Sequence, residues 1–224
     1  MSLAELLARR GRTGLALPLA CRVIAEVAAA LDYAHRLTDG AGVPLGVVHR
    51  DVSPGNVMIA RDGTVKLVDF GLAKARTQIM KTQPGLVKGK FGYLAPEQIR
   101  GQVDYRTDLF ALGLCFYEAV TGTAFFGQAT AAQTVAAIRD LREAPRVAAL
   151  LGAPAELDGV LAKALAPAPE ARFESAAAFR APRSGGSCSR RGHGAVSAEQ
   201  LAAEVARARG GPPSAPPPRL ALPS

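Results

Sequence analysis

Two carboxylates and one amide in this chain stand at spacings that could place oxygen donors around a hard cation. Asp51 and Asn56 lie five residues apart, and Asp69 follows thirteen residues after Asn56. Carboxylate and amide oxygens are ligands that Mg²⁺ accepts, and a positioned carboxylate can also orient a reacting hydroxyl. A metal ion together with such a carboxylate is what phosphoryl transfer requires. A single Asp is more often a turn or helix-capping residue, so the interpretation depends on the residues around these three.

Three short motifs surround these residues in a fixed order. They read HRDVSPGN at residues 49–56, DFG at residues 69–71 and APE at residues 95–97. Ten identities agree with known signatures, and chance agreement is on the order of 10⁻¹³ at about one in twenty per position. The motifs resemble the catalytic loop, the metal-binding motif and the end of the activation segment of protein kinases. The resemblance covers about residues 1–181 and is strongest to the bacterial, eukaryotic-type serine/threonine protein kinases.

The resemblance implies a fold class for most of the chain. We expect the protein-kinase fold (an α+β family), represented by its mainly α-helical C-terminal lobe with one short β-hairpin. The catalytic loop would occupy residues 49–56 and the activation segment residues 69–97. Neither a Gly-x-Gly-x-x-Gly loop nor a strand bearing an ATP-binding lysine precedes His49. We therefore expect the smaller N-terminal lobe, the N-lobe, to be missing from this chain.

The same resemblance implies roles for the residues that could do chemistry. Asp51 would be the catalytic base, and Asn56 and Asp69 would be the Mg²⁺ ligands, so the cofactors would be ATP and Mg²⁺. Met58 would contact the underside of the adenine. Asp69 and Asn56 would thereby also help to bind the nucleotide.

Further residues match structural and regulatory positions of the family. His49 and Phe70 would stack on each other, and Asp108 would hold the backbone of the catalytic loop. The remaining matches are Gly71 of the metal motif, the ion pair of Glu97 with Arg172, and Arg50, which would pair with a phosphothreonine at Thr77 or Thr82. Both threonines could equally be solvated loop residues.

Two positions depart from the usual family pattern. Ser53 stands where serine/threonine kinases usually have a lysine, and Lys90 stands where they usually have a threonine. A hydroxyl and an ammonium have thus exchanged places. Our hypothesis is that Lys90 supplies near the γ-phosphate the positive charge that Ser53 cannot. The alternative is a Lys90 that faces solvent in a degraded site.

Sequence patterns also predict the elements that must position these residues. A helix is expected to about Arg10 from a Ser2/Glu5 capping box, and another from Pro18 to about residue 37. Short strands at 57–59 and 65–68 read as a hairpin, and residues 72–94 as a long loop. The stretch from 107 to 120 is apolar on nearly all sides, which is typical of a buried helix. Further helices are expected at about 129–142, 155–165 and 174–181.

Composition divides the chain into four parts. Residues 1–182 would form the kinase C-lobe, and residues 183–196 a flexible basic linker. A Ser197/Gln200 capping box predicts an isolated helix over residues 197–209. Residues 210–224 are Pro-rich and would be a disordered tail.

Charge and hydropathy limit the partners. The net charge is +8, but no aromatic residues interleave with the late arginines, so we expect no nucleic acid partner. No segment is long and apolar enough to suggest a membrane span, and no signal peptide is visible, so a cytoplasmic location is expected.

Three functions are compatible with these patterns. The first is a serine/threonine protein kinase that phosphorylates a protein substrate but is weak or inactive alone, as a fragment or truncated form. The second is a pseudokinase-like binding module that needs a partner, such as a separate N-lobe; the retained Asp51, Asn56 and Asp69 argue against it. The third is a small-molecule phosphotransferase of the aminoglycoside-kinase type, which lacks the APE segment that is present here.

Overall fold

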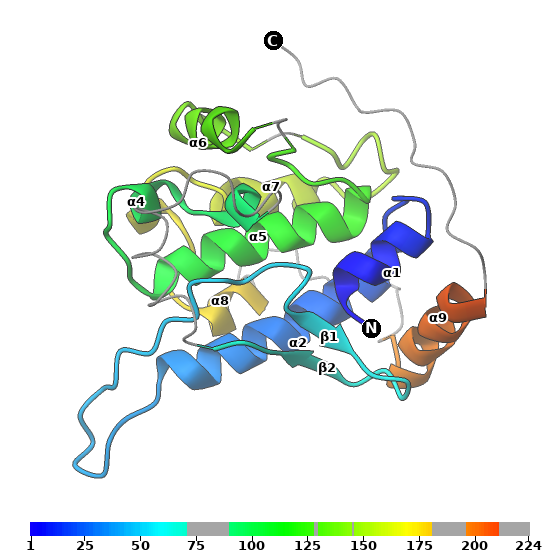
Figure 1. Ribbon diagram of the computed structural model, residues 1–224, viewed down its shortest axis with the longest axis horizontal. Helices are drawn as coiled ribbons and strands as arrows, with labels where there is room; N and C mark the ends of the chain where they lie inside the picture. The colour runs from blue at the N-terminus through cyan, green and yellow to red at the C-terminus, as the bar shows by residue number, and fades with distance from the viewer. Residues whose placement is uncertain (71–89, 128–129, 145, 181–195, 211–224) are drawn as a thin grey trace.

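The computed structural model describes residues 1–70, 90–127, 130–144, 146–180 and 196–210. This part of the chain is mainly helical, with one two-stranded sheet against its side (Figure 1). The elements are, in order, α1 Leu3–Arg9, α2 Leu17–His35, β1 Val57–Ile59, β2 Val65–Leu67, η1 Lys90–Tyr93, α4 Pro96–Ile99, α5 Tyr105–Thr121, α6 Ala131–Arg139, α7 Glu156–Ala164, η2 Pro169–Ala171, α8 Ala176–Arg180 and α9 Ala198–Gly210.

The first two helices begin within one residue of the predicted starts. Ser2 caps α1: its side chain accepts from the Glu5 N–H, and the Glu5 carboxylate accepts from the Ser2 N–H, at 3.1 and 2.9 Å. Pro18 lies in the first turn of α2, where its missing N–H leaves no helical hydrogen bond unmade. Each helix buries one apolar face, so both join the main core.

The central helix α5 forms the middle of the core. Its residues are buried on all sides, including Phe110, Leu112 and Phe116, as the sequence predicts for residues 107–120. α2, α7 and η1 all contact it. In Figure 1, α2 and α5 cross the centre of the molecule and α6 lies outermost on one side.

The predicted hairpin is confirmed, and it ends one residue earlier than expected. β1 and β2 are antiparallel, with Val57 opposite Leu67 and Ile59 opposite Val65. Val57, Ile59 and Leu67 face the core, and Met58 faces outward. The N-terminal residues add to this sheet, because the Ile59 N–H donates to the Met1 carbonyl at 2.8 Å.

The other predicted helices are present but shorter than their apolar patterns suggest. For α6 a cap decides the start, because Thr130 and Gln133 form a capping box that starts the helix at Ala131 rather than at residue 129. Within the predicted loop over residues 72–94, residues 90–93 form the short 3₁₀ helix η1. Residues 71–89 lie outside the described part of the chain.

The expectation of an isolated helix at residues 197–209 is wrong. The capping box of Ser197 with Gln200 is present, and α9 extends to Gly210. However, Leu201 and Val205 are fully buried in the main core, and α9 packs against α1. An amphipathic face of this kind gains stability when it is removed from water, which is why the helix docks.

None of the helices in the described ranges is long and apolar enough to cross a membrane.

Candidate active site

The backbone of the catalytic loop is held by one buried carboxylate. Asp108, on α5, accepts the His49 N–H with Oδ2 and the Arg50 N–H with Oδ1, both at 2.8 Å. The predicted role of Asp108 as an anchor for this loop backbone is therefore matched by these contacts. Its side chain is almost fully buried, and such a charge is tolerated because its oxygens receive several hydrogen bonds.

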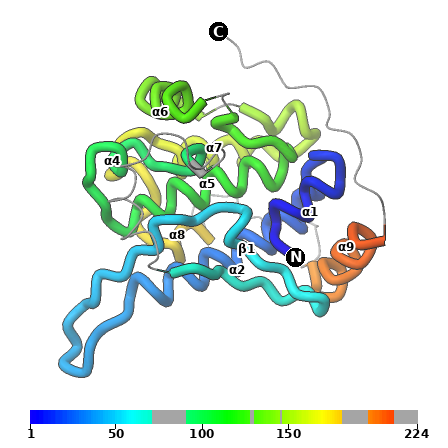
Figure 2. The backbone as a smooth tube through the Cα atoms, viewed as in Figure 1, coloured from blue at the N-terminus to red at the C-terminus, as the bar shows by residue number. Residues whose placement is uncertain are grey.

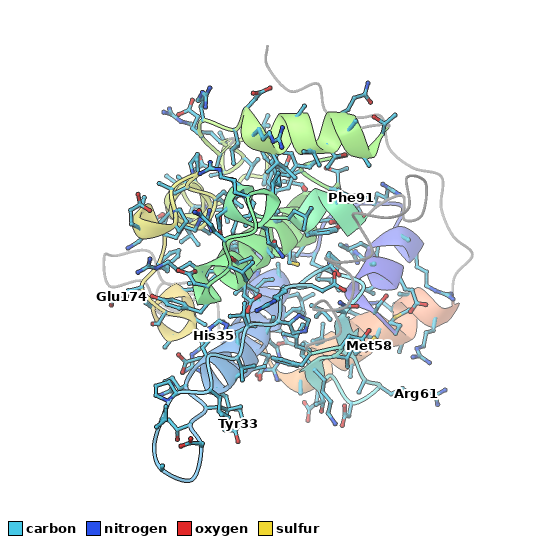
Figure 3. The ribbon with its side chains drawn as sticks, turned by 60° about the vertical axis from the view of Figure 1, so that its left-hand side comes forward. Tyr33, His35, Met58, Arg61, Phe91 and Glu174 are labelled. Atoms are coloured by element: carbon cyan, nitrogen blue, oxygen red, sulfur yellow. The ribbon has the colours of Figure 1, made fainter. Side chains whose placement is uncertain are left out.

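Asp108 has a third hydrogen-bonding partner, which was not predicted from the sequence. His35, the last residue of α2, places Nε2 2.8 Å from Asp108 Oδ2, and its side chain is nearly buried. Figure 3 shows His35 at this end of α2. The available signal was its position four residues after the buried Leu31, on the core-facing side of the helix. A histidine on such a face needs a polar partner, and Asp108 provides it.

His49 connects the catalytic loop to the segment that carries Asp69. Its Nδ1 accepts from the Asp51 N–H at 3.3 Å, and its Nε2 lies 2.9 Å from the Val68 carbonyl. Since a carbonyl can only accept, these contacts assign the proton of a neutral imidazole to Nε2. The Val68 N–H also donates to the Asn56 carbonyl at 3.0 Å. The loop that bears Asp51 and Asn56 is thus joined by hydrogen bonds to the residue just before Asp69.

The Asn56 side chain is oriented by the loop itself. Its Nδ2 donates to the Asp51 carbonyl at 2.7 Å, and its own N–H donates to the Ser53 carbonyl at 2.9 Å. The amide nitrogen therefore forms a hydrogen bond within the loop. The amide oxygen is the atom that remains to bind a ligand.

Two of the predicted site residues have strained backbone conformations. Arg50 has φ +68° and Asp69 has φ +67°, a left-handed region that residues with a side chain seldom adopt. Such strain is of order 1–3 kcal/mol per residue and persists only where neighbours hold it. At Arg50 the neighbours are Asp108, which accepts its N–H, and Gln98, whose Nε2 donates to its carbonyl at 3.0 Å.

Two large apolar side chains are exposed beside this hydrogen-bonded loop system. Phe70 contacts His49 as predicted, with ring centroids 4.4 Å apart, but the rings meet edge-on and are not stacked face to face. Phe70 is nevertheless 39% exposed, and Met58 is 37% exposed. Met58 projects from the outer side of the hairpin (Figure 3). An apolar surface next to convergent polar groups is the usual composition of a ligand site.

The predicted ion pair of Glu97 with Arg172 is confirmed. Arg172 Nη1 and Nη2 donate to the two Glu97 oxygens at 2.6 and 2.8 Å, and both residues are buried. Arg172 also donates to the carbonyls of Ala166, Arg106 and Pro167, and its guanidinium lies over the Phe110 ring. The pair joins the end of the activation segment to the region after α7.

A half-buried pair that sequence reasoning missed joins η1 to α5. The Tyr93 hydroxyl donates to Glu118 Oε2. Burial raises the pKa of Glu118, although the Tyr93 hydrogen bond and the charge of Arg12 oppose this shift. Burial, and next the Glu118 charge, raise the pKa of Tyr93 well above its usual value.

Glu118→Gln is expected to make the free energy of unfolding less sensitive to pH. A carboxyl with a raised folded-state pKa keeps its proton while the unfolded chain has already lost it. Stability therefore falls as pH rises from the ordinary carboxyl pKa to the raised value, and this fall is absent in the glutamine variant. Urea denaturation at about pH 4 and about pH 7 measures the difference between the two proteins. An identical pH dependence of both proteins would contradict the expectation.

Several sequence-predicted residues are not placed. Gly71, Thr77 and Thr82 lie outside the described residues. Lys90 begins η1, but its side chain lies outside the described part of the structure. That Lys90 supplies the positive charge that Ser53 cannot therefore stays a prediction. Ser53 itself is buried in the catalytic loop.

A pocket of about 680 Å³ lies elsewhere, where α4, the start of α5 and η2 meet. Charged residues of both signs line it, among them Arg100, Asp104 and Arg106. Its lining includes Glu97 but no residue of the catalytic loop or hairpin. It is therefore distinct from the cluster of Asp51, Asn56 and Asp69.

Comparisons with known proteins agree with this arrangement. The family description "Protein kinase domain" matches residues 1–182. The tyrosine-protein kinase MasK of Myxococcus xanthus is 43% identical over 174 residues, which are 77% of this chain and 27% of that protein. The serine/threonine-protein kinase PknB of Mycobacterium tuberculosis is 39% identical over 166 residues, which are 72% of this chain and 25% of that protein. The chain thus spans about a quarter of the length of these curated relatives.

Solved structures give the same result for the fold. The crystal structure of the Mycobacterium tuberculosis PknI kinase domain is similar with a TM-score of 0.58 and 31% identity. The match covers 80% of this chain and 59% of that one. The chain therefore belongs to the protein kinase family, with the mainly helical, C-lobe-like architecture of a bacterial, eukaryotic-type kinase.

Proposed function

We propose that this chain transfers the γ-phosphoryl group of ATP to serine or threonine hydroxyls of a protein substrate. The observation that carries this proposal is the anchored catalytic loop. Asp108 fixes its backbone, the Asn56 amide bonds the Asp51 carbonyl, and His49 links the loop to the backbone just before Asp69. Catalysis of phosphoryl transfer is mostly positioning and electrostatic stabilisation, and these contacts supply the positioning.

Asp51 is the proposed catalytic base. It would orient the attacking hydroxyl and accept its proton. The main-chain N–H and carbonyl of Asp51 are both hydrogen-bonded within the loop, so the backbone from which its side chain projects is held in place. Such a base typically contributes about 10²–10⁴-fold to the rate.

The donor set fits Mg²⁺ held partly by phosphate. Asn56 offers its amide oxygen and Asp69 an exposed carboxylate. Among the described residues there is no group of three or more His, Cys, Asp or Glu that would form a metal site by itself. One amide and one carboxylate, completed by phosphate oxygens and water, suit Mg²⁺ better than a metal enclosed by protein ligands. Bound there, Mg²⁺ would neutralise the charge on the phosphates.

Met58 and Phe70 suggest how the rest of the nucleotide site is completed. We propose that Met58 contacts the adenine from below. The exposed faces of both side chains would be covered by an N-lobe, in the same or in a separate polypeptide. The lobe described here contacts the nucleotide from one side, so we expect it to be slow or inactive until that partner is present. ATP as phosphoryl donor would place the reaction in the cytoplasm.

Lys90→Met tests the proposed exchange between Lys90 and Ser53. In the active protein this variant should lose most of kcat, because a positive charge near the γ-phosphate would be removed. Lys163→Met, at an exposed position of α7, is the matched control and should keep wild-type kcat. Unchanged turnover in Lys90→Met would instead support a Lys90 that faces solvent.

The acceptor hydroxyl is the finer part of the proposal. PknB is named a serine/threonine kinase, whereas MasK is named a tyrosine kinase, so tyrosine is the second candidate acceptor. The test is to isolate the protein from the cells that make it, at its natural length. It is then incubated with Mg·ATP and a mixed protein substrate. Phosphoserine or phosphothreonine would support the proposal, and phosphotyrosine the second candidate. Binding of ATP without transfer would favour the pseudokinase-like binding module.

A further inference from the structure

Helix α9 lies outside the residues that match the protein kinase family, yet it is part of the packed lobe. The family match ends at residue 182, and α9 spans Ala198–Gly210. Leu201 is 0% exposed, Val205 1% and Glu204 5%, so one face of the helix is fully covered. Figures 1 and 2 show α9 beside α1 and the turn of the hairpin.

Polar contacts fix α9 to two helices of the lobe. Glu204 pairs with Arg10, the residue that caps the end of α1, and its other oxygen accepts from Arg207 at 2.6 Å. Glu204 thus lies between two cations, Arg10 and Arg207. Burial, and next the charge of Arg207, lower the pKa of Arg10. Arg22 of α2 donates to the Val196 carbonyl, just before α9, at 2.9 Å. A nearly buried carboxylate needs such partners, and they set the position of the helix along α1.

The first residue of α9 lies directly against the hairpin turn. Gly63, in that turn, has φ +81°, and a Cβ built there would lie 1.9 Å from the Ala198 carbonyl oxygen. Any larger residue would force the turn and the helix apart. The turn therefore packs directly against the start of α9.

These contacts close a ring around the strand that carries Met58. α9 contacts the turn at Gly63, and this turn directly follows β1. β1 pairs with the residues before α1, through the Ile59 N–H to the Met1 carbonyl and a bridge between Ser2 and Met58. α1 returns to α9 through Arg10. Asn56 immediately precedes β1 and Asp69 follows β2 by two residues, so both are joined by short stretches of chain to the hairpin that the ring holds at its turn and at β1.

We propose that α9 is a positioning element of the nucleotide site, with Glu204 and the Gly63 contact as the points that set the hairpin. The hairpin in turn sets the places of Asn56, Met58 and Asp69. The importance of this positioning for catalysis rests on the function proposed above. The mechanical coupling between α9 and the hairpin does not.

Gly63→Ala is the direct test, and Gly42→Ala is its matched control. Both glycines have φ +81°, so alanine strains the backbone equally, but nothing lies within 4 Å of a Cβ at Gly42. In the full chain without nucleotide, hydrogen exchange at the Ile59, Ala60 and Val68 amides should be at least about tenfold faster in Gly63→Ala. In Gly42→Ala these amides should keep wild-type rates. Equal exchange in the two variants would overturn the proposal.

A second pair of variants acts from the helix side and leaves the turn intact. Glu204→Gln keeps the shape of the side chain and removes its charge, while Glu199→Gln removes an exposed charge of the same helix. Faster exchange at the same hairpin amides in Glu204→Gln alone is expected. Faster exchange confined to α9 itself would show that the helix merely rests on the lobe.

Titration with Mg·ATP separates this proposal from the proposed function. Binding should be at least about threefold weaker in Gly63→Ala than in Gly42→Ala at matched thermal stability. If the wild-type chain binds no Mg·ATP but hydrogen exchange at the hairpin amides is faster in Gly63→Ala, the coupling between α9 and the hairpin is supported and the proposed kinase function is not. If Mg·ATP binds equally to both variants and hydrogen exchange at the hairpin amides is unchanged, the proposed kinase function can still hold but the positioning role of α9 is refuted.

Discussion

Replacing Asp51 with Asn is expected to lower phosphoryl transfer by roughly 10²–10⁴-fold without unfolding the protein. Asparagine has nearly the same shape but cannot accept a proton from the attacking hydroxyl. The Asp51 N–H donates to His49 Nδ1 and the Asp51 carbonyl accepts from Asn56 Nδ2, and both of these main-chain contacts are kept in the variant. The loss should therefore fall on kcat, while KM for ATP changes little.

The measurement uses the protein at its natural length, with Mg·ATP and its phosphorylated substrate as readout. Asp140→Asn is the matched control, because Asp140 is an exposed residue at the end of α6. It should show wild-type kcat. An Asp51→Asn protein with wild-type kcat would remove Asp51 from the chemistry, and the binding module would then become the better explanation.

Replacing Arg172 with Ala is expected to lower the free energy of unfolding by about 3–5 kcal/mol. The substitution leaves the buried Glu97 without its bidentate partner and removes the donor to three carbonyl groups. The Thr107 hydroxyl, which also donates to Glu97 at 3.1 Å, cannot compensate for a lost charge. Isolated buried charges are far more costly than paired ones, which explains the size of the effect.

Urea denaturation of wild type and variant measures this loss. Arg36→Ala is the control, since Arg36 pairs with Asp32 on the surface of α2 with a largely exposed side chain. Its loss should stay below about 1 kcal/mol. The double variant Glu97→Gln with Arg172→Met should lose less than the sum of the single variants, because neither partner is then left charged and alone. Additive losses would mean that the pair contributes little as a pair.

The loss of the Glu97–Arg172 ion pair should also affect the catalytic loop. Gln98, next to Glu97, donates to the Arg50 carbonyl and so helps to hold a strained residue of the catalytic loop. A displaced Glu97 would move this contact. We therefore expect Arg172→Ala to weaken Mg·ATP binding as well as stability.

Local features of the molecule were predictable from the sequence, because the interacting groups lie within about ten residues of each other along the chain. The capping boxes at Ser2 and Ser197 and the hairpin at residues 57–67 are of this kind. Spacing also identified the buried helix α5. The contacts of Asp108, of Phe70 and of Glu97 with Arg172 join distant segments, and they were predictable only through resemblance to a family.

The tertiary structure alone decided the rest. His35 reaches Asp108 across 73 residues, Tyr93 reaches Glu118, and Glu204 reaches Arg10 across 194 residues. Capping residues and apolar periodicity predict that a helix at about 198 forms and that one face is apolar. They do not state which surface covers that face, because docking depends on the shape and charge that other segments create when they fold. For this reason α9 was expected to be isolated, whereas in the folded chain it lies against α1 and the hairpin.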